Sequence, residues 1–90
     1  DNYRVDLRIV KFAQNNAVIA PVSSLFRDGG AWSVFVPKDG RAVKRTVSVG
    51  GRTAVDAWIE DGLAAGEQVI VYPSDSVRDG VAVEVVRSTR

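Results

Sequence analysis

The sequence predicts an all-β domain, a small antiparallel β-barrel or β-roll of about six or seven short strands. Two observations carry this prediction. The chain of 90 residues holds 17 valines and three leucines, and β-branched side chains fit a sheet better than a helix. Short apolar stretches also recur at regular spacing, with turn residues between them. Because this length allows one small core, residues 1–90 are predicted to form a single domain.

The chain opens with two strand signals. Apolar and polar residues alternate along residues 3–9, which predicts a half-buried strand. The apolar run 17–20 ends at Pro21, which cannot donate to a β-ladder and therefore marks a strand end or a sheet edge. Ser23 and Ser24 then predict one helical turn or a bend.

The middle of the chain predicts a β-hairpin. Turn residues at 27–30 lead into a strand at 32–36, and a second strand follows at 42–49. The segment 38–40 between them, Lys-Asp-Gly, has the length and composition of a hairpin loop.

Further strands follow this hairpin. The two glycines at 50–51 predict a turn into a strand at 53–60. Residues 67–72 are nearly all apolar, which predicts a strand buried on both faces. The last predicted elements are, in order, a turn at 79–80, a strand at 81–85 and a polar tail at 87–90.

A glycine-bracketed turn precedes the buried strand. Gly62 and Gly66 allow the backbone to reverse tightly, and Leu63 between them is predicted to plug the core. The small residues Ala64 and Ala65 avoid a side-chain clash. We interpret this segment as a structural corner and not as a binding site.

Missing residue types exclude several kinds of chemistry. The chain contains no histidine, cysteine or methionine, which removes nucleophile–histidine arrangements and metal sites built on His or Cys. Twelve basic and 11 acidic residues leave a net charge of +1, without the basic stripe of a nucleic-acid-binding protein. We therefore predict no enzymatic activity, no cofactor, no metal site and no nucleic-acid partner.

A few residues invite functional interpretations that have simpler alternatives. Ser23 or Ser24 could act as a nucleophile with a lysine base, but a bend-forming pair is the ordinary explanation. Asp56 and Glu60 lie on the polar face of the predicted strand 53–60, and Asp61 lies in the turn that follows. Their carboxylates fit a solvated surface better than a catalytic acid–base pair. The glycine pairs lack the surrounding pattern of a phosphate-binding loop.

The two tryptophans leave a second functional class open. Trp32 and Trp58 could stack on the bases of single-stranded nucleic acid, as on an OB-like barrel. Alternatively, they fill the core or cover an end of the barrel. A small ligand-binding or OB-like nucleic-acid-binding barrel thus remains the alternative to a protein-contact module.

Five motifs in a fixed order carry a family resemblance. They are Ala20-Pro21 leading to Leu25-Phe26, Val34-Phe35-Val36, Val47-Ser48-Val49-Gly50, Gly62-Leu63 with Gly66-Glu67 and Val69-Ile70, and Asp79-Gly80 with Val83. Together they resemble the C-terminal part of periplasmic adaptor subunits, the membrane fusion proteins of the HlyD type, which serve tripartite efflux and secretion systems. Ala20 and Ser24 depart from the valine and alanine that are usual in that family.

The resemblance implies a membrane-proximal β domain that packs against an inner-membrane transporter. It also implies a Gram-negative periplasmic setting, assembly with other adaptor copies, and an N-terminal membrane anchor that this chain does not contain. The outer-membrane channel would be reached only through domains absent from the chain.

Residues 1–12 are expected to contain a strand shared with a preceding β-barrel domain. Its segment 3–9 should close the sheet within the chain or pair with a neighbouring copy. Because the chain lacks soft ligands, it cannot itself handle copper or silver as some relatives of that family do.

Six residues are candidates for partner docking. Loops on a rigid scaffold concentrate binding residues, and arginine and tryptophan often dominate the binding energy of interfaces. The candidates share positions in or beside predicted turns, and they are Arg27, Asp28, Trp32, Arg52, Arg78 and Asp79.

Overall fold

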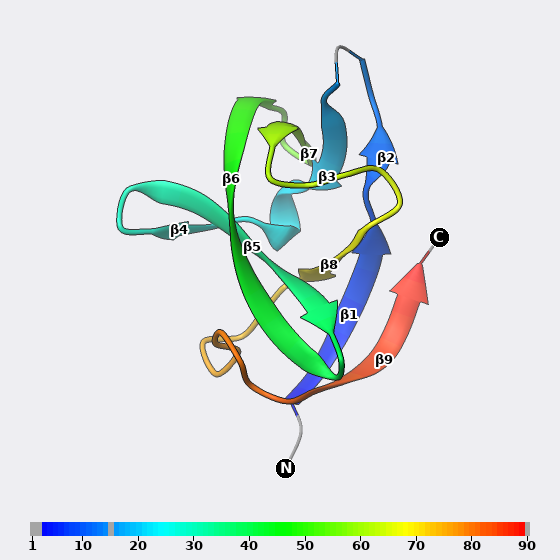
Figure 1. Cartoon of the computed structure of the whole chain (residues 1–90), viewed down its shortest axis with the longest axis vertical. Helices are drawn as coiled ribbons and strands as arrows, with labels where there is room; N and C mark the ends of the chain where they lie inside the picture. Colours follow the sequence, from blue (N-terminus) through cyan, green and yellow to red (C-terminus); the bar gives the residue numbers. More distant parts are fainter. Residues whose placement is uncertain (1–2, 15, 90) are drawn as a thin grey trace.

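The alternating stretch near the start of the chain forms the central strand of a three-stranded sheet. This computed structural model describes residues 3–14 and 16–89. Strand β1 (Tyr3–Ile9) pairs antiparallel with β8 (Gln68–Val71) and parallel with β9 (Val83–Thr89). Figure 1 shows β1 and β9 running side by side. Both sides of β1 are therefore paired within the chain.

The other strands form a six-stranded sheet. In spatial order they are β2 (Lys11–Phe12), β3 (Val18–Pro21), β7 (Asp56–Asp61), β6 (Arg41–Arg52), β5 (Ala31–Lys38) and β4 (Phe26–Asp28). A single 3-10 turn, η1 (Val22–Ser24), follows Pro21 as the sequence predicted. The predicted hairpin is also confirmed, because β5 and β6 pair from Trp32↔Val47 to Lys38↔Arg41.

The core consists of two clusters of buried side chains, and β5 and β8 lie between them. Along β5, Val34 and Val36 face the first cluster and Phe35 faces the second. On β8, Val69 belongs to the first cluster and Ile70 to the second. This arrangement confirms the prediction that the apolar stretch of β8 is buried on both faces.

The all-β prediction is confirmed, with three differences in detail. Pairing is antiparallel between all paired strands except β1 and β9, which are parallel. The described ranges hold nine strands, more than predicted, because the short β2 and β4 lack a strong alternating pattern. Within the same ranges neither sheet closes on itself, so the fold is a two-sheet roll and not a closed barrel.

The predicted turn at Gly50 and Gly51 is wrong, since both glycines lie inside β6. The pairing of β6 with β7 continues past them through two register shifts, between Ser48 and Val49 and between Val49 and Gly51. A β-bulge places an extra residue in one strand. A side chain at Gly50 would meet the Glu60 side chain at 2.6 Å, so the glycine permits this close packing.

Two predicted boundaries also change. β7 begins at Asp56, because residues 53–55 form a bend in which the Thr53 N–H donates to the Asp56 carbonyl. The polar segment 87–89 is not a separate tail, since β9 continues to Thr89 along β1. Arg90, the last residue of the predicted tail, lies outside the described residues. Over the part of the chain that is described, no helix has the length and apolar character needed to cross a membrane.

Candidate functional site

The hairpin formed by β4 and β5 projects from the rest of the molecule (Figure 1). Its two strands turn at Gly29 and Gly30, at the place the sequence predicted. At its base, the rings of Phe26 and Phe35 stack with centroids 4.7 Å apart. Phe35 belongs to the buried core, so the stack fixes a projecting hairpin on a rigid support.

Two arginine side chains gather on the tryptophan of this hairpin. Arg27 on β4 is the direct cross-strand neighbour of Trp32 on β5. The guanidinium carbons of Arg27 and Arg52 each lie 4.8 Å from the centre of the Trp32 ring. Such cation–π contacts contribute about 0.5–1 kcal/mol each at exposed sites. We call Arg27, Trp32 and Arg52 the arginine–tryptophan cluster.

A lysine connects this hairpin to the loop before β9. Lys44 on β6 places its Nζ 2.7 Å from Oδ2 of Asp28, and its backbone N–H donates to Oδ1 of Asp79 at 2.9 Å. The hydrogen bond to Asp28 raises the pKa of the Lys44 ammonium above its ordinary value. Both aspartates are thereby engaged within the domain.

The structure brings most of the predicted docking residues to one region. Arg27, Trp32 and Arg52 meet in the arginine–tryptophan cluster, and Asp28 reaches Asp79 through Lys44. Trp32 is half-buried against the first core cluster and is not wholly outside the core.

One predicted docking residue lies apart from these groups, and one residue that was not predicted takes part in them. Arg78 is exposed next to Asp79 but belongs to neither group. Lys44 was missed by the sequence reasoning, because an alternating strand gives no signal for the distant loop that its backbone contacts.

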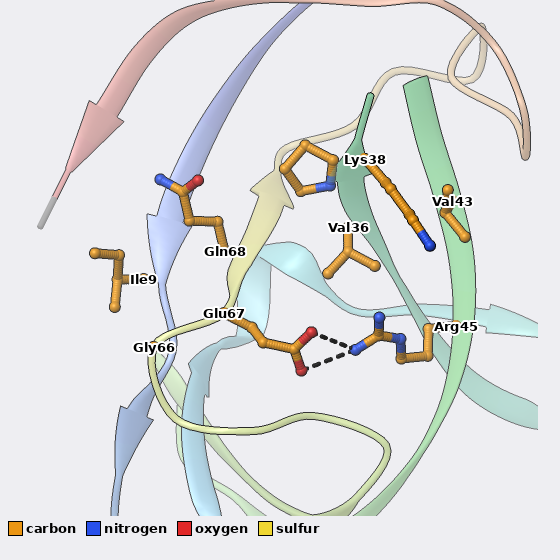
Figure 2. A pocket seen from close by; sticks show the side chains of 9 residues that line it. Ile9, Val36, Lys38, Val43, Arg45, Gly66, Glu67 and Gln68 are labelled. Carbon is orange, nitrogen blue, oxygen red and sulfur yellow. Dashed lines mark hydrogen bonds and ion pairs between the residues drawn. The ribbon is translucent and has the colours of Figure 1, made fainter. Parts of the chain in front are cut away.

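The glycine-bracketed turn is held by an ion pair. Arg45 on β6 donates through Nη1 to both carboxylate oxygens of Glu67, at 2.7 and 2.8 Å (Figure 2). The same nitrogen reaches the Gly62 carbonyl at 3.3 Å, and the Ala64 N–H donates to Glu67 at 2.8 Å. Leu63 is half-buried and packs against the first core cluster. The turn is therefore held on its solvent side by Arg45 and on its core side by Leu63, and the Gly66 N–H donates to the Val10 carbonyl at 2.9 Å.

An open groove of about 750 Å³ lies beside this ion pair. Figure 2 shows Glu67 and Arg45 joined by their ion pair among the lining side chains, with Lys38 and Val43 on the side of β5 and β6. A ligand site needs convergent polar groups that are free to bind. Here Arg45 pairs with Glu67, and Gln68 donates to the Ser88 hydroxyl, which leaves Lys38 as the one charged side chain of the lining without an ion pair to a described residue. The groove therefore gives little support to a ligand-binding barrel.

We expect Glu67→Gln to lower the free energy of unfolding by about 1 kcal/mol at neutral pH, since the ion pair is partly exposed. The hydrogen bonds from Arg45 hold the pKa of the Glu67 carboxyl below its ordinary value of 4.5. A carboxyl with a lowered folded-state pKa stabilises the fold above its unfolded-state pKa, and this contribution disappears as the pH falls through the folded value. Urea unfolding of both proteins across acidic pH should therefore show the difference shrinking below 4.5. A difference that stays constant with pH would contradict this account.

The other candidates have structural explanations. The Ser24 hydroxyl is buried and donates to the Pro21 carbonyl at 2.7 Å, so it caps a turn. Glu60 and Asp61 are exposed on β7, as a solvated strand face requires. Trp58 is 39% exposed on the same strand. Across residues 3–14 and 16–89, no three His, Cys, Asp or Glu side chains are placed to hold a metal ion.

Comparison with known proteins places this chain in a family. A family model described as the C-terminal permuted SH3-like domain of YknX matches residues 17–85. The chain belongs to this family. The match contains the whole projecting hairpin, the arginine–tryptophan cluster and the glycine-bracketed turn.

Individual relatives of this chain are named for multidrug resistance, macrolide export or solvent efflux. The chain is 32% identical over 88 residues to the multidrug resistance protein MdtA of Cronobacter turicensis, which covers 97% of this chain and 21% of that protein. It is 41% identical over 59 residues to the macrolide export protein MacA of Yersinia pestis, covering 63% and 16%. It is 35% identical over 77 residues to the solvent efflux pump periplasmic linker SrpA of Pseudomonas putida, covering 83% and 20%.

These comparisons confirm the resemblance to periplasmic adaptor proteins that the sequence motifs indicated. Two relatives are named a putative efflux system component and a periplasmic linker, names that agree with the prediction of a non-catalytic domain. The chain spans about a fifth of the length of the curated relatives that it matches.

Proposed function

We propose that this adaptor domain is a non-catalytic protein-interaction module that docks on an inner-membrane transporter. Through the rest of the adaptor it would help to couple that transporter to an outer-membrane channel for efflux or secretion. Its relatives include a multidrug resistance protein and an efflux pump linker, which supports a role in efflux. The setting we propose is the periplasm, with attachment to the inner membrane through a segment absent from this chain and with further adaptor copies as neighbours.

The arginine–tryptophan cluster is the observation that carries the proposed docking. It lies on a projecting hairpin whose base is fixed in the core by the Phe26–Phe35 stack. Rigid loops and hairpins are where binding residues concentrate, and Arg and Trp are enriched among residues that dominate interface energies. Asp28, Asp79 and the exposed Arg78 extend the proposed docking surface toward the loop before β9.

Reversing the charge of this surface tests the proposal. In the complete adaptor, Arg27→Glu combined with Arg52→Glu and Arg78→Glu should weaken co-purification with the transporter by at least about tenfold, because opposite charge patterns steer and stabilise interfaces. Export in cells should fall in parallel. Adaptor abundance and circular dichroism should stay unchanged, since all three changes lie outside the two core clusters.

A matched triple variant controls for the change in charge. Arg8, Lys11 and Lys38 are exposed and form no ion pair with another described residue. Replacing all three with glutamate alters the net charge equally but leaves the proposed docking surface intact. Export that is equally reduced by both triple variants, or unchanged by the first, would exclude this surface as the docking site.

A further inference from the structure

The two arginines of the cluster converge although they carry the same charge. They come from different strands, Arg27 from β4 and Arg52 from the last position of β6. Each guanidinium carbon is 4.8 Å from the centre of the same ring. The two guanidinium carbons are therefore no more than twice this distance apart. That separation is within the Debye length of about 10 Å at moderate salt, so their repulsion is incompletely screened.

Neighbouring cations are neutralised within the fold, but these two are not. Lys44 pairs with Asp28, and Arg45 pairs with Glu67. In contrast, neither Arg27 nor Arg52 forms an ion pair with any of the residues that the structure describes. The only carboxylate adjacent to the cluster in sequence, that of Asp28, is already engaged by Lys44. Both guanidinium groups of the cluster thus lack a carboxylate in ion-pair contact among the residues that the structure describes.

The Trp32 side chain beneath these charges is held in place by the fold before any partner binds. Trp32 is half-buried against the first core cluster, and its backbone is paired on one side with Arg27 and on the other with Val47. Arg52 reaches the ring from a strand that pairs with β7 at Ala57, which is fully buried. Little rearrangement is needed to present both guanidinium groups, and a preorganised site loses less entropy on binding.

We propose that Arg27 and Arg52, held over Trp32, form a carboxylate-binding site that takes an acidic segment of the partner protein. A guanidinium group binds a carboxylate through two parallel hydrogen bonds, a geometry that an ammonium group cannot reproduce. A carboxylate bound to either guanidinium also reduces the repulsion between the two positive charges. The charges complement an extended segment with two or more Asp or Glu side chains. The identity of that partner as the transporter rests on the proposed function above, whereas the preference for carboxylates does not.

A peptide titration tests the carboxylate preference in the chain itself. Trp32 and Trp58 are the two tryptophans of the sequence, so each indole N–H gives one resonance in a proton–nitrogen spectrum. Hexaglutamate should shift the Trp32 resonance and the side-chain N–H resonances of the two arginines. The Trp58 resonance serves as an internal reference and should not move. Hexaglutamine, which has the same length without charge, should move none of them.

Substitutions distinguish a bidentate site from a general charge effect. Arg27→Gln and Arg52→Gln should each weaken hexaglutamate binding by about tenfold, the usual effect of losing one charge-assisted contact. Replacing both arginines with lysine keeps the charge but should still weaken binding, because the paired hydrogen bonds are lost. Arg8→Gln is the matched control, because Arg8 is exposed on β1 outside the proposed docking surface, and it should leave affinity unchanged.

Three results would overturn the proposal. The first is no shift at Trp32 with hexaglutamate at millimolar concentration. The second is full affinity in the double lysine variant, which would indicate nonspecific attraction. The third is tighter binding of inorganic phosphate than of hexaglutamate, which would make the cluster a phosphate site.

The outcome also separates this inference from the proposed function. If charge reversal abolishes transporter association but hexaglutamate fails to bind, the docking surface stands and the acidic partner is wrong. If hexaglutamate binds as expected but charge reversal leaves association intact, the carboxylate site stands and docking on the transporter is wrong.

Discussion

Gly62→Ala should destabilise this chain by about 3–5 kcal/mol, a large share of the stability of a small domain. Gly62 has a φ of 103°, a backbone conformation that residues with a side chain rarely adopt. A methyl group there would lie 2.6 Å from the Thr46 carbonyl oxygen and 2.8 Å from a methyl of Val47. Because Val47 is buried in the first core cluster, neither neighbour can move away freely. Urea unfolding followed by tryptophan fluorescence measures the loss.

Gly66→Ala provides a matched control in the same turn. Gly66 also has a positive φ, 90°, but no atom lies within 4 Å of the position its side chain would occupy. We therefore expect the backbone penalty alone, about 1–2 kcal/mol. The difference between the two variants isolates the clash beneath Gly62. Equal losses in both would show that the turn is not packed against β6 as the structure indicates.

The contrast between these glycines shows what the sequence could and could not predict. Two glycines around Leu63 predicted a tight turn, because glycine permits positive φ. Only the three-dimensional structure shows that Gly62 lies against β6 whereas Gly66 lies in open space. The Arg45–Glu67 pair that fastens the turn joins residues 22 positions apart, so no local pattern could reveal it.

Local patterns predicted the strands better than the way they pair. The alternation along residues 3–9 gave the bounds of β1 correctly, and the Lys-Asp-Gly loop gave the β5–β6 hairpin. The parallel pairing of β1 with β9 connects the two ends of the chain and depends on how the whole fold closes. Gly50 and Gly51 misled the prediction because a glycine pair is a turn signal in isolation, whereas here it allows a bulge in a paired strand.

The candidate site was likewise predictable from the sequence only in part. Arg27 and Trp32 face each other because a short glycine turn joins their strands, which a sequence pattern can suggest. The arrival of Arg52 over the same ring follows from the path of β6 along the sheet, which is a tertiary feature. Composition could name the residue types that dominate interfaces, but the convergence of two arginines needed the structure.

Strand β8 contributes side chains to both core clusters and so connects them. It packs Val69 into the first cluster and Ile70 into the second, and it pairs with β1 through Ile70 and Leu7. The Ile70 side chain is fully buried. A cavity at this position would lie between strands that are already paired, so the surroundings have little freedom to collapse into it.

Ile70→Ala should therefore lower the free energy of unfolding by about 2–5 kcal/mol, the range for removing a large aliphatic side chain from a packed core. Val86→Ala is the comparison, since Val86 is 51% exposed on β9 and its loss should cost only about 0.5 kcal/mol. Denaturant unfolding monitored by circular dichroism gives both values. Because Ile70 contacts a cluster to which β1, β5 and β8 all contribute, the transition should stay cooperative while its midpoint falls. A midpoint as high as that of Val86→Ala would mean that the second cluster contributes little to the stability of the domain.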